Sequence, residues 1–373
     1  MAANIGAFTR IAYLWCMPQQ PRILVAPLDW GLGHATRCIP VVHALLDGGA
    51  EVILGGSEPG LSILKEVYPQ LASVDVPGYN VRYARRAPMA LSMAFQMPRV
   101  MRTVREENKW LDAQTDPLAL DAVVSDNRYG LWSDRIPCVF MSHQIHIQAP
   151  ALKHSLYRWQ VRMIRHFREI WVPDDPGLNN LSGDLSHGQP LPANLRYVGP
   201  LSRFNAPETK PPRKGGGLVL LSGPEPQRTI LEHVLARWLK DQPSPYMVVR
   251  GWAKSPPPDV GVHVKWMDHL PPDALQKALL EADHIICRSG YSTLMDLDRL
   301  GRTAIVIPTP GQTEQEYLAE RWMTLGRGVA CSQHSLQLDA ALASLKQLPD
   351  ANFKREDLLT PVVKGFVDSL KSC

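Results

Sequence analysis

Residues 281–325 read EADHIICRSGYSTLMDLDRLGRTAIVIPTPGQTEQEYLAERWMTL, and the rest of the chain follows the pattern of this stretch. The apolar run at 282–287 predicts a short strand, and the β-branched run at 304–307 predicts a second one. Between them a helix is predicted from Ser292, a suitable N-cap, to Gly301, a suitable C-cap. Two parallel strands joined by one helix form a right-handed crossover, so the stretch predicts an α/β domain with a parallel sheet.

Two loops follow these strands, at 288–292 and 308–316, and both are expected at the carboxyl edge of the sheet, where ligands bind. Gly290 allows a ligand to approach the backbone closely, and the free amides of the helix start suit a diphosphate. Asp296 lies about one turn into the helix and can accept hydrogen bonds from ribose hydroxyls. The run Glu314–Glu316 offers donors and acceptors for the hydroxyls of a sugar. A helix cap, a solvated aspartate and a polar loop are the alternative interpretation of the same residues.

The stretch resembles the donor-binding segment of GT-B glycosyltransferases, most closely glycosyltransferase family 28, the UDP-N-acetylglucosaminyltransferases of peptidoglycan synthesis. The family's Arg-Ser-Gly stands here at 288–290, and Asp296 occupies the place of the glutamate that holds the ribose. Gln315 matches the first of two adjacent glutamines that face the donor sugar, whereas Glu316 replaces the second. The resemblance covers most of the C-terminal half and only weakly the N-terminal half, and the change at Glu316 leaves the donor sugar open.

The resemblance implies an α/β protein of the GT-B class, with two Rossmann-like domains that face each other across a cleft. Residues 21–200 are then the acceptor-binding domain, and residues 218–350 are the nucleotide-sugar donor-binding domain. The proline-rich, polar segment 201–217 is expected to be the linker, and residues 1–20 an N-terminal extension. The last helix, within 351–373, is expected to cross back to the first domain.

The same resemblance assigns further donor contacts. Arg203 matches an arginine of the interdomain linker that reaches the nucleotide, and an arginine can pair with phosphate oxygens; a solvated linker arginine is the alternative. Ser222 and Gly223 match the phosphate loop loosely, because nearby prolines remove amide donors. The backbone of Met267 corresponds to the position that meets the uracil. The predicted donor-binding residues are therefore Arg203, Ser222, Gly223, Met267, Arg288, Ser289, Gly290, Asp296, Glu314, Gln315 and Glu316.

His34 is the leading candidate for a catalytic base. It follows a buried strand at 22–27 and a glycine-containing loop, and a helix is predicted from Ala35 to Asp47. The positive end of that helix disfavours imidazolium, so the ring is expected to be neutral and able to take a proton. Inverting sugar transfer needs such a base for the acceptor hydroxyl and a positive site for the departing diphosphate. Two alternatives are that His34 only binds the acceptor or that it caps its loop.

Asp29 and Asp126 are the other catalytic candidates. The resembling family has a glycine-rich loop ending in Gly-His, and this chain has Asp29 and Trp30 where the family has glycines. Asp29 could therefore be the base or could orient His34. Asp126 follows a predicted strand and is a second candidate base, with a surface Asx turn as the alternative. The predicted acceptor-binding residues are Gly31, Gly33, His143 and Gln144, the last two by resemblance to a His-Glu-Gln-Asn segment of the family.

Amino-acid composition bears on nucleic-acid binding, metal and disulfide sites, and membrane contact. The net charge of +4 over 373 residues is too small to indicate nucleic-acid binding. The six cysteines lie far apart without a CxxC pair, so no metal site or disulfide framework is expected, and a reducing cytoplasm is favoured. No apolar run reaches the ~18 residues of a membrane span. Two basic segments, 82–105 and 153–168, carry apolar residues and are read either as contacts with the inner face of a membrane or as core-packed helices with solvated edges.

These observations together predict an inverting, metal-independent glycosyltransferase that needs no cofactor and moves a hexose or N-acetylhexosamine from a UDP-sugar to an acceptor hydroxyl. The acceptor is open: a lipid-linked sugar, a glycan or a small molecule. The run Gly31–Arg37 also resembles a UDP-sugar hydrolase of pseudaminic acid synthesis, so a hydrolase or 2-epimerase on the same fold is the alternative. A sugar-nucleotide binder without catalytic activity is a third hypothesis.

Overall fold

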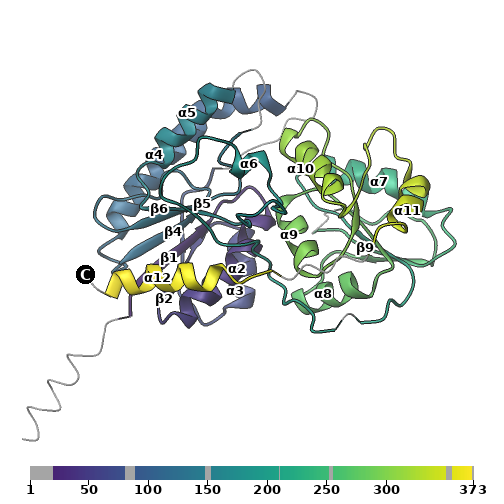
Figure 1. Ribbon diagram of the computed structural model, residues 1–373, viewed down its shortest axis with the longest axis horizontal. Coiled ribbons are helices and arrows are strands. Elements are labelled where there is room, and N and C mark those ends of the chain that lie inside the picture. Colours follow the sequence, from purple (N-terminus) through teal and green to yellow (C-terminus); the bar gives the residue numbers. More distant parts are fainter. Residues whose placement is uncertain are drawn as a thin grey trace, which may run out of the picture.

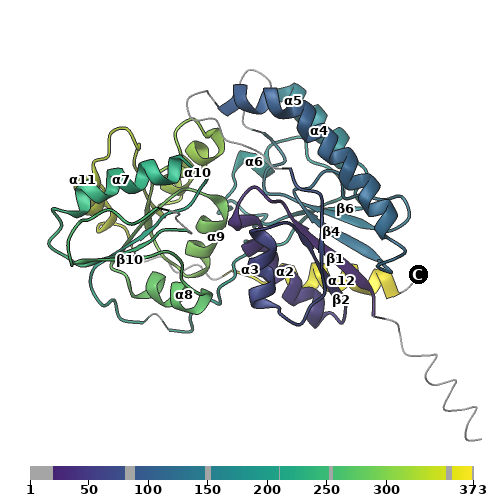
Figure 2. The same ribbon diagram turned by 180° about the vertical axis from the view of Figure 1, so that it is seen from behind.

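The structure is a computed structural model and describes residues 20–79, 89–147, 153–209, 211–251, 255–349 and 355–371. Figure 1 shows two lobes, each built around a sheet with helices on its faces, and Figure 2 shows the same arrangement from behind. Every strand pair in both sheets is parallel. The predicted α/β class with two Rossmann-like domains is therefore confirmed.

The N-terminal sheet has seven strands in the order β3-β2-β1-β4-β5-β6-β7, and its order reverses beside β1, as in doubly wound folds. Its strands are β1 (Arg22–Pro27), β2 (Glu51–Gly56), β3 (Ser73–Asp75), β4 (Ala122–Asp126), β5 (Cys138–Met141), β6 (Glu169–Val172) and β7 (Leu195–Tyr197). Its helices are α2 (Leu32–Asp47), α3 (Gly60–Val67), α4 (Met89–Gln114), α5 (Lys153–Ile164) and α6 (Asp184–His187).

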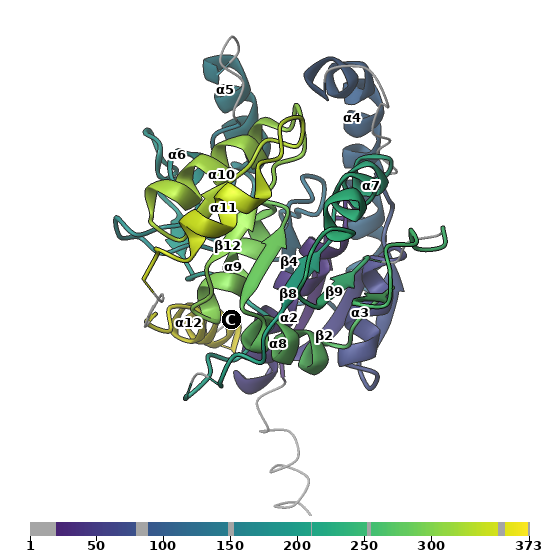
Figure 3. The same ribbon diagram turned by 90° about the vertical axis from the view of Figure 1, so that its right-hand side faces the viewer.

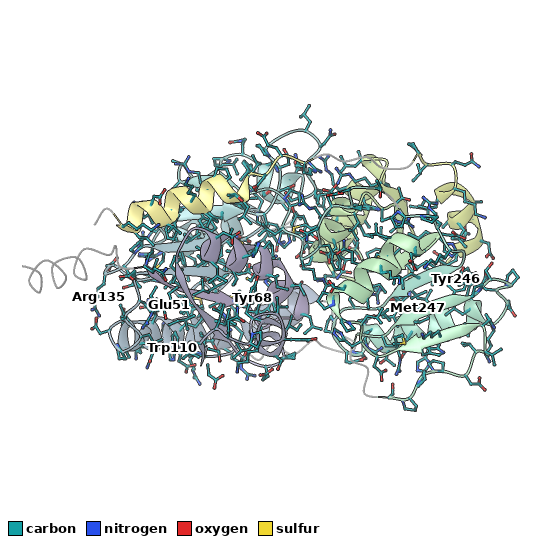
Figure 4. All side chains as sticks on the ribbon, turned by 90° about the horizontal axis from the view of Figure 1, so that it is seen from below. Glu51, Tyr68, Trp110, Arg135, Tyr246 and Met247 are labelled. Carbon is teal, nitrogen blue, oxygen red and sulfur yellow. The ribbon has the colours of Figure 1, made fainter. Side chains whose placement is uncertain are left out.

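The C-terminal sheet has six strands in the order β10-β9-β8-β11-β12-β13. Its strands are β8 (Gly217–Leu220), β9 (Tyr246–Val249), β10 (Val264–Met267), β11 (His284–Cys287), β12 (Ala304–Val306) and β13 (Gly328–Ala330). Its helices are α7 (Gln227–Leu239), α8 (Pro272–Glu281), α9 (Tyr291–Arg299), α10 (Thr313–Thr324) and α11 (Leu338–Leu345). Figure 4 labels Tyr246 and Met247 on this sheet, opposite the lobe that carries Glu51 and Tyr68.

The final helix, α12 (Leu359–Lys371), lies against the N-terminal lobe although it follows the C-terminal one (Figure 1). The ring of Phe366 packs edge-on against Trp171 of β6, with 5.6 Å between ring centroids. Lys371 Nζ donates a hydrogen bond to the carbonyl oxygen of Gly48, at the end of α2, over 3.1 Å. The last helix thus joins the end of the chain to the first domain.

Strand register brings distant loops to one edge. Pro27 at the end of β1 pairs with Asp126 at the end of β4, so the loop leading to His34 starts beside Asp126. In the second sheet Cys287 pairs with both Leu220 and Val306, which places the loops after β8, β11 and β12 side by side. Helices α2 and α9 contact each other, so these two carboxyl edges face one another (Figure 2).

Two predicted helix starts are wrong. Helix α2 begins at Leu32 rather than Ala35, so His34 lies inside its first turn. Helix α9 begins at Tyr291 with Gly290 as its N-cap, and Ser292 lies within the helix. The reason is tertiary: Ser292 Oγ donates to the carbonyl oxygen of Gly33 in the other domain, over 2.9 Å, instead of capping its own helix.

No helix among the residues described is both long enough and apolar enough to cross a membrane.

Candidate active site

His34 lies in the first turn of α2, and Asp126 orients its ring. The Nδ1 atom of His34 is 2.9 Å from Oδ2 of Asp126, a residue 92 positions along the chain. The Asp126 side chain is fully buried, whereas 18% of the His34 side chain is exposed. Because Nδ1 faces the carboxylate, Nε2 on the other side of the ring is the nitrogen that could accept a proton from a substrate.

Arg37, one turn further along α2, completes this cluster. Its Nε is 3.0 Å from each carboxylate oxygen of Asp126, and its Nη2 is 2.7 Å from Nδ1 of His34. Its Nη1 is 3.1 Å from Nδ1 of His143. Arg37 was not predicted as a site residue from the sequence. Residues three positions apart lie on one face of a helix, so its spacing from His34 was the signal that could have identified it.

The electrostatics of the cluster favour a neutral His34. Burial lowers the pKa of His34, the Arg37 guanidinium lowers it further, and Asp126 opposes both in part. Burial alone would raise the pKa of Asp126, but Arg37 and His34 hold it below its ordinary value. Asp126 is therefore an ionised carboxylate held between His34 and Arg37, and the choice between His34 and Asp126 as the base stays a prediction.

Asp29 does not orient His34. Its Oδ2 accepts a hydrogen bond from the backbone N–H of Tyr79 over 3.0 Å, and its Oδ1 is buried without a hydrogen-bond partner. The predicted pairing of Asp29 with His34 is replaced by the pairing with Asp126, because the β1–β4 register places Asp126 beside the start of α2. Asp29 instead holds the loop after β1 against the segment around Tyr79.

A second buried acid, Glu107 of α4, joins the segment around Tyr79 to the loop after β4. It accepts hydrogen bonds from Tyr79 Oη, from Arg128 Nη1 at 2.7 Å and from the N–H of Gly130 at 3.0 Å. Arg128 also donates from its Nε to the carbonyl oxygen of Pro27 over 2.8 Å. Burial raises the pKa of Glu107 to about 7, against the effect of these donors.

Three of the predicted acceptor residues, Gly33, His143 and Gln144, contact other parts of the protein. Gly33 lies against the other domain: a Cβ at this position would be 2.8 Å from Ser292 Oγ, so a side chain there would push α2 and α9 apart. His143 is nearly buried, and its ring stacks on Tyr291 of α9 with centroids 4.0 Å apart. The carbonyl oxygen of Gln144 accepts a hydrogen bond from Gln160, so its backbone anchors α5.

Glu314 connects the two domains. Its Oε1 is 3.0 Å from Nε2 of His143, although Glu314 lies in α10 of the C-terminal domain and His143 follows β5 of the N-terminal one. Burial by itself would raise the pKa of Glu314, but His143 and Arg37 more than offset it and lower the pKa below its ordinary value. The loops predicted to face each other across the cleft therefore do so, and Glu314 touches the cluster around His34 directly.

Gln315 and Glu316 brace their own loop. Gln315 Oε1 accepts from the N–H of Thr309 over 2.9 Å, and Glu316 Oε1 accepts from the N–H of Gly311 over 2.9 Å. Ser289 Oγ donates to the carbonyl oxygen of Gln315 over 2.7 Å, which ties the loop after β11 to the start of α10. Of the predicted sugar-contacting run, Glu314 alone reaches the opposite domain in this arrangement.

The Arg288 side chain does not lie where a diphosphate contact requires it. It is fully buried and donates from Nη1 to the carbonyl oxygens of Ile307 and Pro308, each over 3.1 Å, and from Nη2 to that of Gln227 over 2.9 Å. Desolvation lowers the pKa of Arg288 to about 10. We therefore correct its predicted role: Arg288 holds the loops after β11 and β12 and the start of α7 together.

Asp296 is buried in α9 and bound to the linker. Ser202 Oγ donates to its Oδ1 over 2.7 Å, and Arg203 Nε lies 3.3 Å from its Oδ2. Burial raises the pKa of Asp296, and Arg203 and Ser202 act in the opposite direction. Arg203 also lies over the ring of Phe204, 4.9 Å from its centroid. Arg203 and Asp296 were both predicted at the nucleotide, and the structure shows them as an ion pair.

Backbone rather than charged side chains borders the open part of the site. An added Cβ would meet no atom within 4 Å at four glycines of these edges, Gly31, Gly223, Gly290 and Gly311. Gly290 is the N-cap of α9, and no side chain caps that helix start. Ser222 and Gly223 follow β8 on the same edge, whereas Met267 ends β10 and its carbonyl oxygen accepts from Arg250 over 2.8 Å. The start of α9 thus has no side-chain cap, and no atom of the residues described lies close to its N-cap residue Gly290 on the Cβ side.

Nothing in the described ranges groups three His, Cys, Asp or Glu side chains closely enough to hold a metal ion.

Comparison with known proteins finds similarity to glycosyltransferases. Residues 265–364 match the glycosyltransferase family 28 C-terminal domain. Over 99 residues the chain is 32% identical to a UDP-N-acetylglucosamine--N-acetylmuramyl-(pentapeptide) pyrophosphoryl-undecaprenol N-acetylglucosamine transferase of Haemophilus influenzae (strain PittEE), which is 26% of this chain and 27% of that relative. The chain thus spans about a quarter of the length of this relative.

Two further similarities cover nearly the whole chain. An uncharacterized glycosyltransferase of Methanosarcina acetivorans is 22% identical over 364 residues, or 90% of each protein. The crystal structure of the glycosyltransferase SnogD from Streptomyces nogalater superposes with a TM-score of 0.62 at 18% identity, covering 95% of each chain. The fold is that of a GT-B glycosyltransferase, and the C-terminal domain is similar to that of family 28.

Proposed function

We propose that the chain is an inverting, metal-independent glycosyltransferase that moves a sugar from a UDP-sugar to an acceptor hydroxyl. The observation that supports this most is that α2 and α9, the helices at which two sets of groups lie, contact each other. One set is the pair of His34 and Asp126, in which a proton on Nδ1 leaves Nε2 of the histidine able to act as a base. The other is the uncapped start of α9 at Gly290, which borders open space.

In the proposed reaction His34 Nε2 takes the proton of the acceptor hydroxyl as its oxygen attacks the anomeric carbon of the donor. The bond from that carbon to the diphosphate oxygen breaks, and UDP leaves with the electron pair. Attack from the face opposite the leaving group inverts the configuration at the anomeric carbon. Asp126 keeps the proton on Nδ1 and stabilises the imidazolium that forms, as the carboxylate does in a catalytic triad.

The leaving diphosphate is proposed to bind backbone amides at the start of α9. This helix is long enough to carry a positive N-terminal potential, and its N-cap residue Gly290 allows a close approach. Arg288 is not assigned to this task, because its guanidinium is buried against carbonyl oxygens. Arg203 lies 3.3 Å from Asp296. When the ribose hydroxyls bind Asp296, Arg203 loses this partner, and we assign it as the cation that turns toward the phosphate.

The donor class is proposed from the matched C-terminal domain, because the family 28 relative is named for UDP-N-acetylglucosamine. Asp296 occupies the position expected to hold the ribose, and Glu314 is assigned to the sugar hydroxyls. Because Gln315 and Glu316 hold their own loop in this structure, the choice between a hexose and an N-acetylhexosamine stays open.

The acceptor is placed on the N-terminal domain, and we propose peripheral contact with a membrane surface in a reducing, cytoplasmic setting. Helices α4 and α5 stand at the end of this domain remote from α12 (Figure 3). Exposed arginines lie on these helices, at Arg99, Arg102 and Arg105 of α4 and at Arg158 and Arg162 of α5, and Arg165 directly follows α5. Such cations attract anionic lipids. The apolar residues predicted at 89–96, and the start of the second basic segment, are outside the described side chains.

A panel of UDP-sugars tests the proposal in two steps. A thermal-shift screen finds the donor that stabilises the protein most, and that donor is then incubated with and without candidate acceptors, with and without a chelator. Transfer that depends on the acceptor and resists chelation is the expected result. Rapid donor loss without any acceptor would instead favour a hydrolase, and UDP binding without turnover would favour a binding protein.

A further inference from the structure

Five charged or titratable side chains form one connected cluster across the cleft. Asp126, His34, Arg37 and His143 come from the N-terminal domain, and Glu314 comes from α10 of the other domain. Their contacts run from the histidine that takes the proton to a carboxylate assigned to the donor sugar. The proposed reaction uses the two ends of this cluster and leaves Arg37 and His143 without a task.

Arg37 and Asp126 make opposite demands on His34. The Nδ1 atom lies 2.9 Å from an oxygen of Asp126, which can only accept a hydrogen bond, and 2.7 Å from Nη2 of Arg37, which can only donate one. A proton on Nδ1 satisfies Asp126 and leaves Nε2 free to act as a base. A bare Nδ1 satisfies Arg37 and places the proton on Nε2, where it blocks that role.

Asp126 and His143 together hold Arg37 in the present arrangement. Glu314 accepts a hydrogen bond from Nε2 of His143, so in the neutral ring the other nitrogen is an acceptor, and Arg37 Nη1 lies 3.1 Å from it. Stacking on Tyr291, with only 5° between the ring planes, prevents the imidazole from turning. As long as Glu314 holds His143, Arg37 is held with Nη2 against His34.

We propose that Glu314 and His143 act through Arg37 as positioning residues that keep His34 in the non-basic tautomer until the donor sugar draws Glu314 away. The inference rests on the proposed function, since it assigns Glu314 to the sugar. Without the Glu314 contact, His143 no longer holds Nη1 of Arg37, so the guanidinium can turn about its Nε contacts with Asp126 and move Nη2 away from Nδ1 of His34, which then donates to Asp126. His34 can therefore act as a base only when a donor is bound, which limits proton removal in the absence of a donor.

The charges that face His34 support the direction of this effect. Arg37 and His143 disfavour a proton on the ring, Asp126 favours it, and the Cys38 thiol contacts Asp126 from the same helix. Glu314 is ionised at neutral pH, because its pKa is lowered, and it is close enough to interact with both Arg37 and His34.

Nitrogen NMR of histidine rings reads the tautomer directly and needs no substrate. Protein labelled with [15N]histidine is compared with Glu314→Ala, and the His34 signals are assigned by their loss in His34→Gln. Glu314 is 25% exposed in the first turn of α10, so its truncation is expected to leave the fold intact. Glu314→Gln keeps an acceptor for His143, and Glu320→Ala removes an exposed charge two turns further along the same helix.

The expected result is that Nδ1 of His34 changes from an unprotonated to a protonated nitrogen frequency in Glu314→Ala. Glu314→Gln and Glu320→Ala should keep the wild-type frequencies. Adding the donor found by the UDP-sugar panel should produce the same change in the wild type, and UDP alone should not.

A His34 that shows the same tautomer in wild type and in Glu314→Ala would overturn the inference, as would an equal change in Glu320→Ala. If the tautomer changes as expected but no UDP-sugar is turned over, the coupling between Glu314 and His34 stands and the proposed function fails. The two failures are therefore distinguishable.

Discussion

Asp126 is the buried anion on which the candidate active site depends, so Asp126→Asn is the most informative substitution. The carboxylate is fully buried, and the Arg37 side chain that it pairs with is only 2% exposed. Asparagine has the same shape but no charge, and its amide nitrogen is a donor where both neighbours need an acceptor. The substitution therefore leaves a buried guanidinium without its anion.

The structure gives the size of the effect. Arg37 donates to Asp126 from both Nε and Nη2, and hydrogen bonds to charged groups contribute about 1.5–3 kcal/mol each. Asp126→Asn removes the negative charge that accepts two such bonds and keeps one neutral oxygen acceptor. We therefore expect a decrease of about 3–5 kcal/mol in the free energy of unfolding. Tautomer inversion at His34 adds a loss of transfer of about 10²- to 10⁴-fold.

Urea denaturation followed by tryptophan fluorescence measures the first effect, and acceptor-dependent UDP release measures the second. His34→Gln is the matched control, because it removes the base but keeps the buried ion pair and should cost less than about 1 kcal/mol. Adding Arg37→Met to Asp126→Asn should recover more than half of the lost stability, since it removes the unpaired charge. A single Asp126→Asn variant that unfolds within about 1 kcal/mol of the wild type, or that retains transfer, would refute the reasoning.

Four further predictions concern the base, the ribose site and a buried acid. His34→Ala should reduce transfer by about 10²- to 10⁴-fold and leave the Kd for UDP unchanged in titration calorimetry; full transfer by this variant would show that another group is the base. Because the pKa of His34 is lowered from 6.5, kcat/KM should decrease as pH falls, with a midpoint below pH 6.5, and a midpoint above 6.5 contradicts that shift. Asp296→Ala should weaken UDP binding by about 10- to 100-fold, if loss of a carboxylate acceptor for the ribose costs about 1.5–3 kcal/mol; an unchanged Kd would remove Asp296 from the donor site. Burial raises the pKa of Glu107 from 4.5 to about 7, so the stabilisation from its protonated form is present below pH 4.5 and is lost as pH rises to 7. Urea denaturation at pH 5 and 7.5 should show a loss of up to about 3 kcal/mol from this group that is absent in Glu107→Gln, and parallel pH profiles would contradict it.

Local sequence was sufficient for the two α/β halves and for the edges where ligands would bind. Apolar runs separated by glycine and proline set the strands, and a parallel sheet places the following loops at one edge regardless of side-chain detail. The loops around Gly290 and Glu314 and the turn before His34 could therefore be predicted, and the structure places them opposite one another.

Pairings between distant residues could not be read from the sequence. The partner of His34 is Asp126 rather than the nearby Asp29, because the register of β1 with β4 decides which carboxylate lies beside α2. Likewise Arg288 follows a strand as a ligand-binding residue would, yet its side chain turns inward to three backbone carbonyls.

The sequence by itself determined which chemical groups lie at the ends of the strands, because the positions of strands and of the loops that follow them can be read from local periodicity. Only the tertiary structure decided which of those groups touch, since a hydrogen bond depends on the placement of both partners to within an ångström. Arg37 shows the difference: its helix face follows from its spacing to His34, whereas its contacts with Asp126 and His143 depend on two other strands.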